Sequence, residues 1–166
     1  MSSFLAVTEG ANERTALMIH VIANDFSTSG TPVSLGDSVF GTNGDPVNLS
    51  SQYDDCSYGQ LSFTPAQGQN ITDGVVQLTI DMNVQGASRG TVRNAVITAG
   101  NAVFGSLFAQ ADHIMFALPP NTDGDWIAYA SVNGTSSVYN NNWATYVSAQ
   151  MHELGHNLGM GHSGIG

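Results

Sequence analysis

A segment near the end of the chain, from His152 to His162, carries three histidines and one acid at a fixed spacing. His152 and His156 are four residues apart, so one turn of helix places both imidazoles on the same side, where their nitrogens can reach one zinc ion at about 2.0–2.1 Å. Glu153 is rotated by about 100° from His152 and can reach a water molecule at the metal without binding the metal. The spacing therefore predicts a helix that presents two metal ligands and a general base.

The predicted helix has to end near Gly159, because glycine tolerates the left-handed conformation that terminates many helices. The chain can then turn back and bring His162 to the same metal ion. On a helical wheel, an apolar stripe lies roughly 150° away from the His152 and His156 pair. The stripe consists of Val147, Met151, Leu154 and Leu158. One face of the helix can therefore pack in the core while the other offers nitrogen ligands to a cleft.

The motif is specific, because it fixes five positions with residues that are each infrequent. A chance match in a chain of this length is on the order of one in ten thousand. The remaining histidines, His20 in an apolar run and His113 at the start of another, are expected to be structural residues held by hydrogen bonds. Cys56 is the single cysteine, so no disulfide can form within the chain. We expect it to be a buried or surface residue rather than a further metal ligand.

The remaining sequence alternates between strand and helix patterns along one domain that follows a loose lead-in at residues 1–14. Residues 16–23 are almost continuously apolar, which is typical of a strand buried on both faces. Residues 75–84 alternate as a half-buried strand does, and residues 88–110 have helical periodicity with Ser88 as the cap. Shorter helices are expected at 35–40 and 48–58, and strands at 61–63, 113–118, 126–132 and 135–139. This order indicates an α/β (α+β) layer with a mixed sheet.

Composition excludes several classes of partner. The chain has 166 residues, 42% of them hydrophobic, with three arginines, no lysine and a formal charge of −10. Such a surface repels phosphate backbones and anionic lipid headgroups, so we expect neither nucleic-acid nor membrane binding. The start of the chain lacks the features of a signal peptide, so the protein is either cytosolic or its targeting segment is absent from this sequence. Nothing in the sequence fixes the oligomeric state.

The histidine segment matches the zinc-binding motif of the metzincin metalloproteases, H-E-x-x-H-x-x-G-x-x-H. The sequence HELGHNLGM also resembles that of the reprolysins, and Ser163 after the third histidine resembles the pattern of the matrixins. Residues 125–130, with the sequence DWIAYA, look like the metzincin edge strand that borders the substrate cleft. Residues 56–61 and 146–153 are most similar to the gametolysin-like (peptidase M11) family.

The resemblance implies a metzincin-like upper lobe, in which a twisted mixed five-stranded sheet lies over two long helices and the last helix carries the zinc motif. It implies Zn²⁺ held by His152, His156 and His162, with Glu153 as the general base. The substrate peptide would lie along residues 127–130. These residues are Ile127, Ala128, Tyr129 and Ala130. The family resemblance further implies a secreted zinc endopeptidase that cleaves extracellular matrix or cell-wall proteins.

One departure from the family pattern concerns the end of the chain. Metzincins continue past the third histidine to a methionine-containing turn and a small lower lobe, whereas this sequence stops at Gly166. Met160 lies inside the motif and cannot be that turn. We therefore expect residues 15–166 to form the upper lobe alone, with the lower lobe absent.

Two other functions compete with the zinc endopeptidase. A non-catalytic, zinc-stabilised domain that binds proteins, or an inactive truncated fragment, would also contain the three histidines. The presence of Glu153 argues against a purely structural site, which needs no base. A calcium-binding module would rest only on residues 121–125, where an ordinary turn is the simpler interpretation because the loop lacks the spacing and the distal Glu of a calcium motif.

Overall fold

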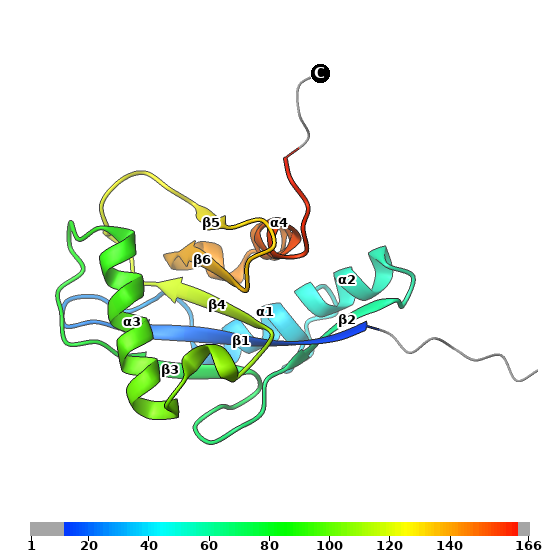
Figure 1. Ribbon diagram of the computed structural model, residues 1–166, viewed down its shortest axis with the longest axis horizontal. Coiled ribbons are helices and arrows are strands. Elements are labelled where there is room, and N and C mark those ends of the chain that lie inside the picture. Colours follow the sequence, from blue (N-terminus) through cyan, green and yellow to red (C-terminus); the bar gives the residue numbers. More distant parts are fainter. Residues whose placement is uncertain (1–11, 163–166) are drawn as a thin grey trace, which may run out of the picture.

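The computed structural model describes residues 12–162 as a mixed six-stranded sheet with helices on both faces (Figure 1). The strands are β1 (Asn12–Ile22), β2 (Leu61–Pro65), β3 (Val75–Thr79), β4 (His113–Leu118), β5 (Ala128–Ala130) and β6 (Ser136–Asn140). The helices are α1 (Pro32–Phe40), α2 (Leu49–Cys56), α3 (Arg89–Phe104) and α4 (Val147–Asn157). Ser163 and the first eleven residues of the expected lead-in lie outside the described residues.

Strand β1 is the centre of the sheet. It pairs in parallel with β4 along one edge and with β2 and then β3 along the other. Residues 16–21 are buried, as expected for a strand that is covered on both faces. The strand begins at Asn12, so residues 12–14 belong to the sheet rather than to a loose lead-in. Beyond β4 the order continues through β6 to β5, which is antiparallel and forms the edge of the sheet.

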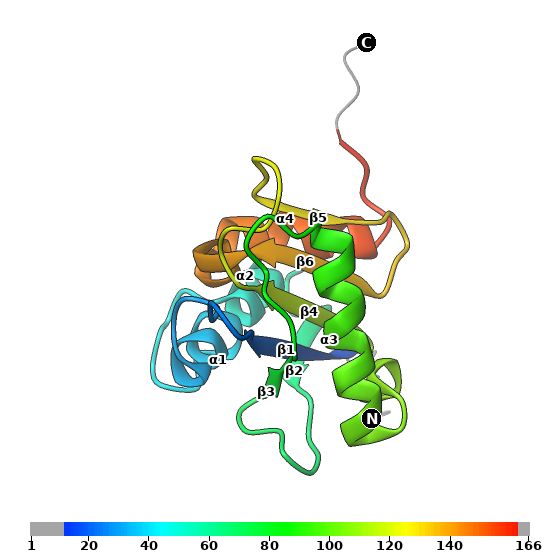
Figure 2. The ribbon, with the colours of Figure 1, turned by 90° about the vertical axis from the view of Figure 1, so that its left-hand side faces the viewer.

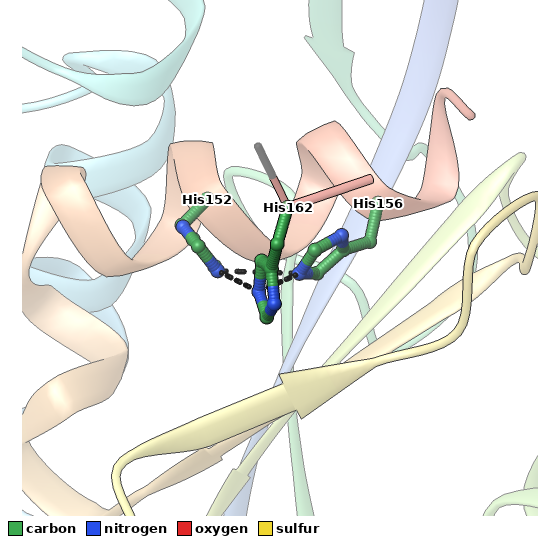
Figure 3. Close-up of side chains that lie close together, drawn as sticks. All are labelled: His152, His156 and His162. Carbon is green, nitrogen blue, oxygen red and sulfur yellow. Dashed lines mark hydrogen bonds between the residues drawn. The ribbon is translucent and has the colours of Figure 1, made fainter. Parts of the chain in front are cut away.

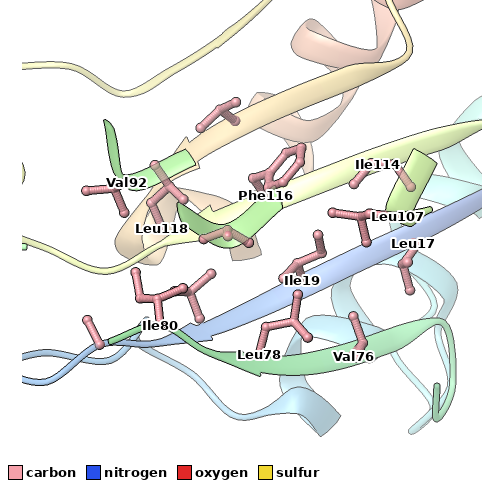
Figure 4. Packing of buried hydrophobic residues seen from close by; sticks show 14 of the residues in the cluster. Leu17, Ile19, Val76, Leu78, Ile80, Val92, Leu107, Ile114, Phe116 and Leu118 are labelled. Atoms are coloured by element: carbon pink, nitrogen blue, oxygen red, sulfur yellow. The ribbon is translucent and has the colours of Figure 1, made fainter. Parts of the chain in front are cut away.

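Side chains that alternate along β1 divide the interior into two cores. Leu17 and Ile19 face α3, where Val92 and Val96 complete one cluster (Figure 4). Met18, between them in sequence, faces the opposite layer, which is formed by α1, α2 and α4 (Figure 2). From that layer Leu35, Leu49 and Leu154 are fully buried. Helix α4 is thereby fixed against one face of the sheet, beside the edge strand β5.

Among residues 12–162, no helix is both long enough and apolar enough to cross a bilayer.

The α/β (α+β) class is confirmed. The sheet has six strands, which is the number that the sequence pattern predicted and one more than the family resemblance implied. The described chain has two longer helices, α3 and α4, and the two expected shorter ones, α1 and α2. Strand β3, which was expected within residues 75–84, pairs with the second half of β1 after β2 has ended at Pro65. The expected helix at 88–110 is capped by Ser88 but stops at Phe104, because Gly105 adopts a φ of 77°. Gly100 leaves room there for the returning Leu107, which lies 2.8 Å from the position of a Cβ atom.

Two expected strands are shorter in the structure than in the sequence pattern. The strand at 75–84 ends at Thr79, although Val76, Leu78, Ile80 and Val84 still face one core as the alternation predicts. The strand at 126–132 is reduced to β5. Residues 123–125 bend the chain, and Trp126 Nε1 donates a hydrogen bond to Thr122 Oγ1 across the bend. Cys56 is exposed and its thiol is free.

Candidate metal centre

Helix α4 is held at its start and its middle by buried polar contacts. The Gln150 side chain is fully buried, and its Nε2 donates to the Ala144 carbonyl at 2.6 Å and to Ser38 Oγ at 3.0 Å. The Tyr53 hydroxyl, from α2, donates to the Met151 carbonyl at 2.8 Å. These bonds connect α4 to α1 and α2, and they fix the rotation of the helix about its axis.

The end of α4 is held against the β5–β6 connection. Asn157 Nδ2 donates to the carbonyls of Ser131 and Ser136, each at 3.1 Å. The chain then reverses at Gly159, where φ is 94°. A Cβ atom at this position would lie 2.9 Å from Asn133 Oδ1, so both the backbone conformation and the available space require glycine. The helix itself ends at Asn157, and Gly159 lies in the reversal that follows it.

The reversal brings all three histidines of the motif together. The three Nε2 atoms form a triangle with sides of 3.2 Å (His152 to His156), 3.1 Å (His152 to His162) and 3.1 Å (His156 to His162), as Figure 3 shows. The other nitrogen of His156, Nδ1, lies 2.8 Å from the Met160 carbonyl and donates to it. A neutral imidazole with its proton on Nδ1 has a free lone pair on Nε2.

The three Nε2 atoms point toward one another. A proton between two of them makes one hydrogen bond. The third Nε2 atom then faces a lone pair or an N–H group with which it makes no favourable contact. A positive ion in contact with all three lone pairs satisfies them together. His152, His156 and His162 are the group of possible metal ligands found within the described part of the chain. They line an open cavity of about 450 Å³ together with Met151 and Met160. The arrangement can hold a metal ion next to space for a substrate.

Glu153 lies beside this cluster, and its side chain is more deeply buried than we expected for a general base. It is only 6% exposed, and its Oε2 atom is buried without a hydrogen-bond partner among the described residues. Burial raises the pKa of the Glu153 carboxyl, and the nearby His156 and His162 partly oppose this shift. A carboxylate with a raised pKa binds a proton more readily than an exposed one.

The other two histidines are buried elsewhere in the sheet. His20 Nε2 lies 3.2 Å from the Thr28 carbonyl, which confirms its prediction as a hydrogen-bonded structural residue. His113 packs its ring against Phe63, with 5.6 Å between ring centroids, but its Nδ1 has no partner among residues 12–162. Burial lowers the pKa of both imidazoles, which favours their neutral form, while a hydrogen bond with the Thr28 backbone at His20 and one with the Asn157 side chain at His113 oppose the shift.

This burial predicts a loss of stability in mild acid. In the unfolded chain both histidines have a pKa of about 6.5, above their folded values, so the unfolded state binds more protons as the pH falls below that value. We expect the free energy of unfolding of the metal-free protein, measured with urea, to decrease as the pH is lowered from 7.5 to 5.5. Each histidine contributes a slope of at most about 1.4 kcal/mol per pH unit. The variant His113→Gln should show a shallower slope, and equal slopes in the two proteins would contradict the assignment.

Strand β5 passes beside the histidine cluster (Figure 3) and its outer edge is the edge of the sheet. Asn140 N donates to the Ile127 carbonyl at 2.9 Å, which makes these residues a hydrogen-bonded pair. Because such pairs alternate along an antiparallel ladder, Tyr129 is in the next one, and the peptide groups of Ala128 and Ala130 face outward. Ile127 precedes the strand and is 51% exposed. Two of the residues expected to bind substrate, Ala128 and Ala130, thus present backbone N–H and C=O groups at the edge of the sheet.

Three contributors to the site were missed at the level of sequence. Gln150 and Asn157 hold α4 in place, and the Met160 carbonyl fixes the tautomer of His156. A signal for the first two was present, because both fall within about 60° of Leu154 on the helical wheel. Polar residues on the apolar side of a helix usually have specific buried partners. The Met160 contact depends on the reversal at Gly159 and had no such signal.

Comparison with known families agrees with this geometry. The model of the gametolysin peptidase M11 family matches residues 14–166, which is nearly the whole chain. No curated protein matches the sequence. The family match includes the sheet, the edge strand and the three clustered histidines. The chain therefore belongs to the gametolysin peptidase M11 family, whose members are metallopeptidases that hydrolyse peptide bonds.

Proposed function

We propose that the protein is a zinc-dependent endopeptidase in which His152, His156 and His162 hold the metal and Glu153 is the general base. The observation that carries the proposal is the triangle of Nε2 atoms with sides of 3.1–3.2 Å. Two nitrogens at 2.0–2.1 Å from one tetrahedral zinc ion are about 3.3–3.4 Å apart, close to this spacing. Three neutral imidazoles without a fourth protein ligand are also typical of catalytic zinc sites, which keep one position open.

In the proposed reaction, zinc supplies the Lewis acidity that activates a water molecule and polarises the scissile carbonyl. Glu153 accepts the proton of that water on its carboxylate and later delivers it to the nitrogen of the leaving amine. The contacts of Gln150, Tyr53 and Asn157 hold α4 in one orientation relative to the sheet, so that Glu153 and the two histidines of the helix keep a fixed position relative to β5. His156 keeps its proton on Nδ1, through the Met160 carbonyl, and offers only the lone pair of Nε2.

The proposed binding mode is addition of the substrate as an extended strand to β5. The outward peptide groups of Ala128 and Ala130 provide donors and acceptors for the substrate backbone. The small side chains of these two alanines leave the edge accessible. Ile127 and Tyr129 alternate with these alanines along the chain. Ile127 is exposed and Tyr129 is partly exposed, so both can contact substrate side chains.

The proposed substrates are proteins of the extracellular matrix or cell wall, and the proposed location is outside the cell. Two observations support this proposal: membership of the gametolysin family and a formal charge of −10 without lysine. The same charge argues against nucleic acids and anionic membranes as partners.

The proposal is tested by incubating the protein with purified matrix and cell-wall proteins and identifying the fragments by mass spectrometry. An endopeptidase produces internal fragments, and a chelator prevents their appearance. Release of terminal residues alone would contradict the endopeptidase assignment. Binding of these proteins without cleavage would favour a non-catalytic, zinc-stabilised binding domain.

A further inference from the structure

Two of the three arginines of this acidic chain lie on the first turns of α3, next to the edge strand. The guanidinium carbon of Arg89 is 5.0 Å from the ring centroid of Tyr129 in β5 and 5.6 Å from that of Trp126. The guanidinium carbon of Arg93 is 5.1 Å from the ring centroid of Phe116. The aromatic rings thus hold both cations close to the strand where we propose that the substrate binds.

The arginine side chains have unused hydrogen-bonding capacity. Arg93 Nη2 donates to Ser136 Oγ at 3.1 Å, whereas a guanidinium has five N–H donors. Arg89 is exposed. A cavity of about 220 Å³ lies here, and its lining includes Arg93, Asn94, Tyr129 and Ser136. The site therefore combines positive charge, free donors and space at the edge of the sheet.

The two faces of β5 lead to different surroundings. Tyr129 packs with the core on the α3 side, whereas Ala128 packs with the core on the α4 side, where the histidines lie. A peptide that pairs with β5 has side chains that alternate between the same two faces. Substrate residues on the face of Tyr129 point toward Arg89 and Arg93, and residues on the other face point toward the histidine cluster.

We propose that Arg89 and Arg93 form a subsite for an acidic side chain, Asp or Glu, of the substrate peptide. A carboxylate can accept two parallel hydrogen bonds from one guanidinium, which is the pairing for which arginine is best suited. The inference rests on the proposed function, because it uses β5 as the substrate strand. It adds a preference that alternates along the peptide: acidic residues are favoured at every second position, on the face of Tyr129.

The test measures binding rather than turnover, so that it does not depend on hydrolysis. A set of fluorescent peptides, each with one Gln replaced by Glu, is titrated against the zinc-loaded Glu153→Gln variant at low salt, and affinity is measured by anisotropy. We expect Glu to strengthen binding about three- to tenfold at alternate positions only. Added salt should reduce this gain, because a partly exposed ion pair is screened.

The double substitution Arg89→Gln with Arg93→Gln, made in the same background, should abolish the preference for Glu, and replacing both residues by Lys should restore part of it. Arg14→Gln is the control for each single substitution, Arg89→Gln or Arg93→Gln, because it removes one positive charge from the start of β1 and should leave the preference unchanged. Equal binding of Glu and Gln peptides, a preference without alternation, or binding of neither peptide overturns the inference. Cleavage of the Gln peptides by the unsubstituted protein reports separately on the proposed function.

Discussion

Replacing Glu153 by Gln should lower the kcat of peptide hydrolysis by about 10²–10⁴-fold, while the protein should still bind zinc. The amide has nearly the same shape as the carboxylate but cannot accept the proton of the attacking water, and general-base catalysis contributes about this factor. The loss corresponds to about 3–5 kcal/mol of transition-state stabilisation. Because Gln leaves the three histidines in place, the KM for the peptide and the zinc content should change little.

Glu13→Gln is the matched control for this substitution. It makes the same chemical change and removes the same charge at an exposed position of β1. Initial rates on one peptide, with zinc content measured on the same samples, separate loss of the base from loss of the metal. Turnover within threefold of the unsubstituted protein in the Glu153→Gln variant would remove Glu153 from the mechanism.

Replacing His152 by Ala should weaken zinc binding by about 100-fold or more, since one of three protein ligands is lost. Hydrolysis at stoichiometric zinc should then fall to the background level. His152 is exposed, so the substitution should change the free energy of unfolding of the metal-free protein by no more than about 0.5 kcal/mol. Zinc affinity is measured by competition with a chromogenic chelator.

Ser148→Ala provides the control for this variant, because Ser148 is exposed one helical turn before His152 on α4. It should bind zinc and cleave peptides as the unsubstituted protein does. If His152→Ala retained the zinc affinity of the Ser148→Ala control, the three histidines could not be the metal site.

The metal ligands were predictable from sequence because their geometry is almost entirely local. His156 follows His152 by four positions, about one turn of helix, and one glycine allows the reversal that returns His162. The central strand was equally clear, since a continuous apolar run has few alternatives to a strand buried on both faces. The edge strand was visible as a pattern, although β5 itself is only three residues long.

The missed features depend on contacts between segments that are distant in sequence. The burial of Glu153 arises from the packing of α4 on the sheet, which a helical wheel does not describe. Strand β3 was predicted from its alternating pattern, but its place beside the second half of β1, beyond the end of β2 at Pro65, depends on pairing between distant segments. The position of Arg89 and Arg93 beside Tyr129 likewise follows from the way α3 crosses the sheet. From the composition, these two arginines were known only as two of the three basic residues, and their position next to the edge strand could not be predicted.

The most direct test of the central claim is a titration of zinc into the metal-free protein, with the initial rate of peptide hydrolysis measured after each addition. The account predicts a rate that rises linearly and stops rising at one equivalent of zinc, with no such rise in the His152→Ala variant at the same concentrations. A rate that is unaffected by zinc, or an equal rise in the His152→Ala variant, would contradict a catalytic zinc site formed by His152, His156 and His162.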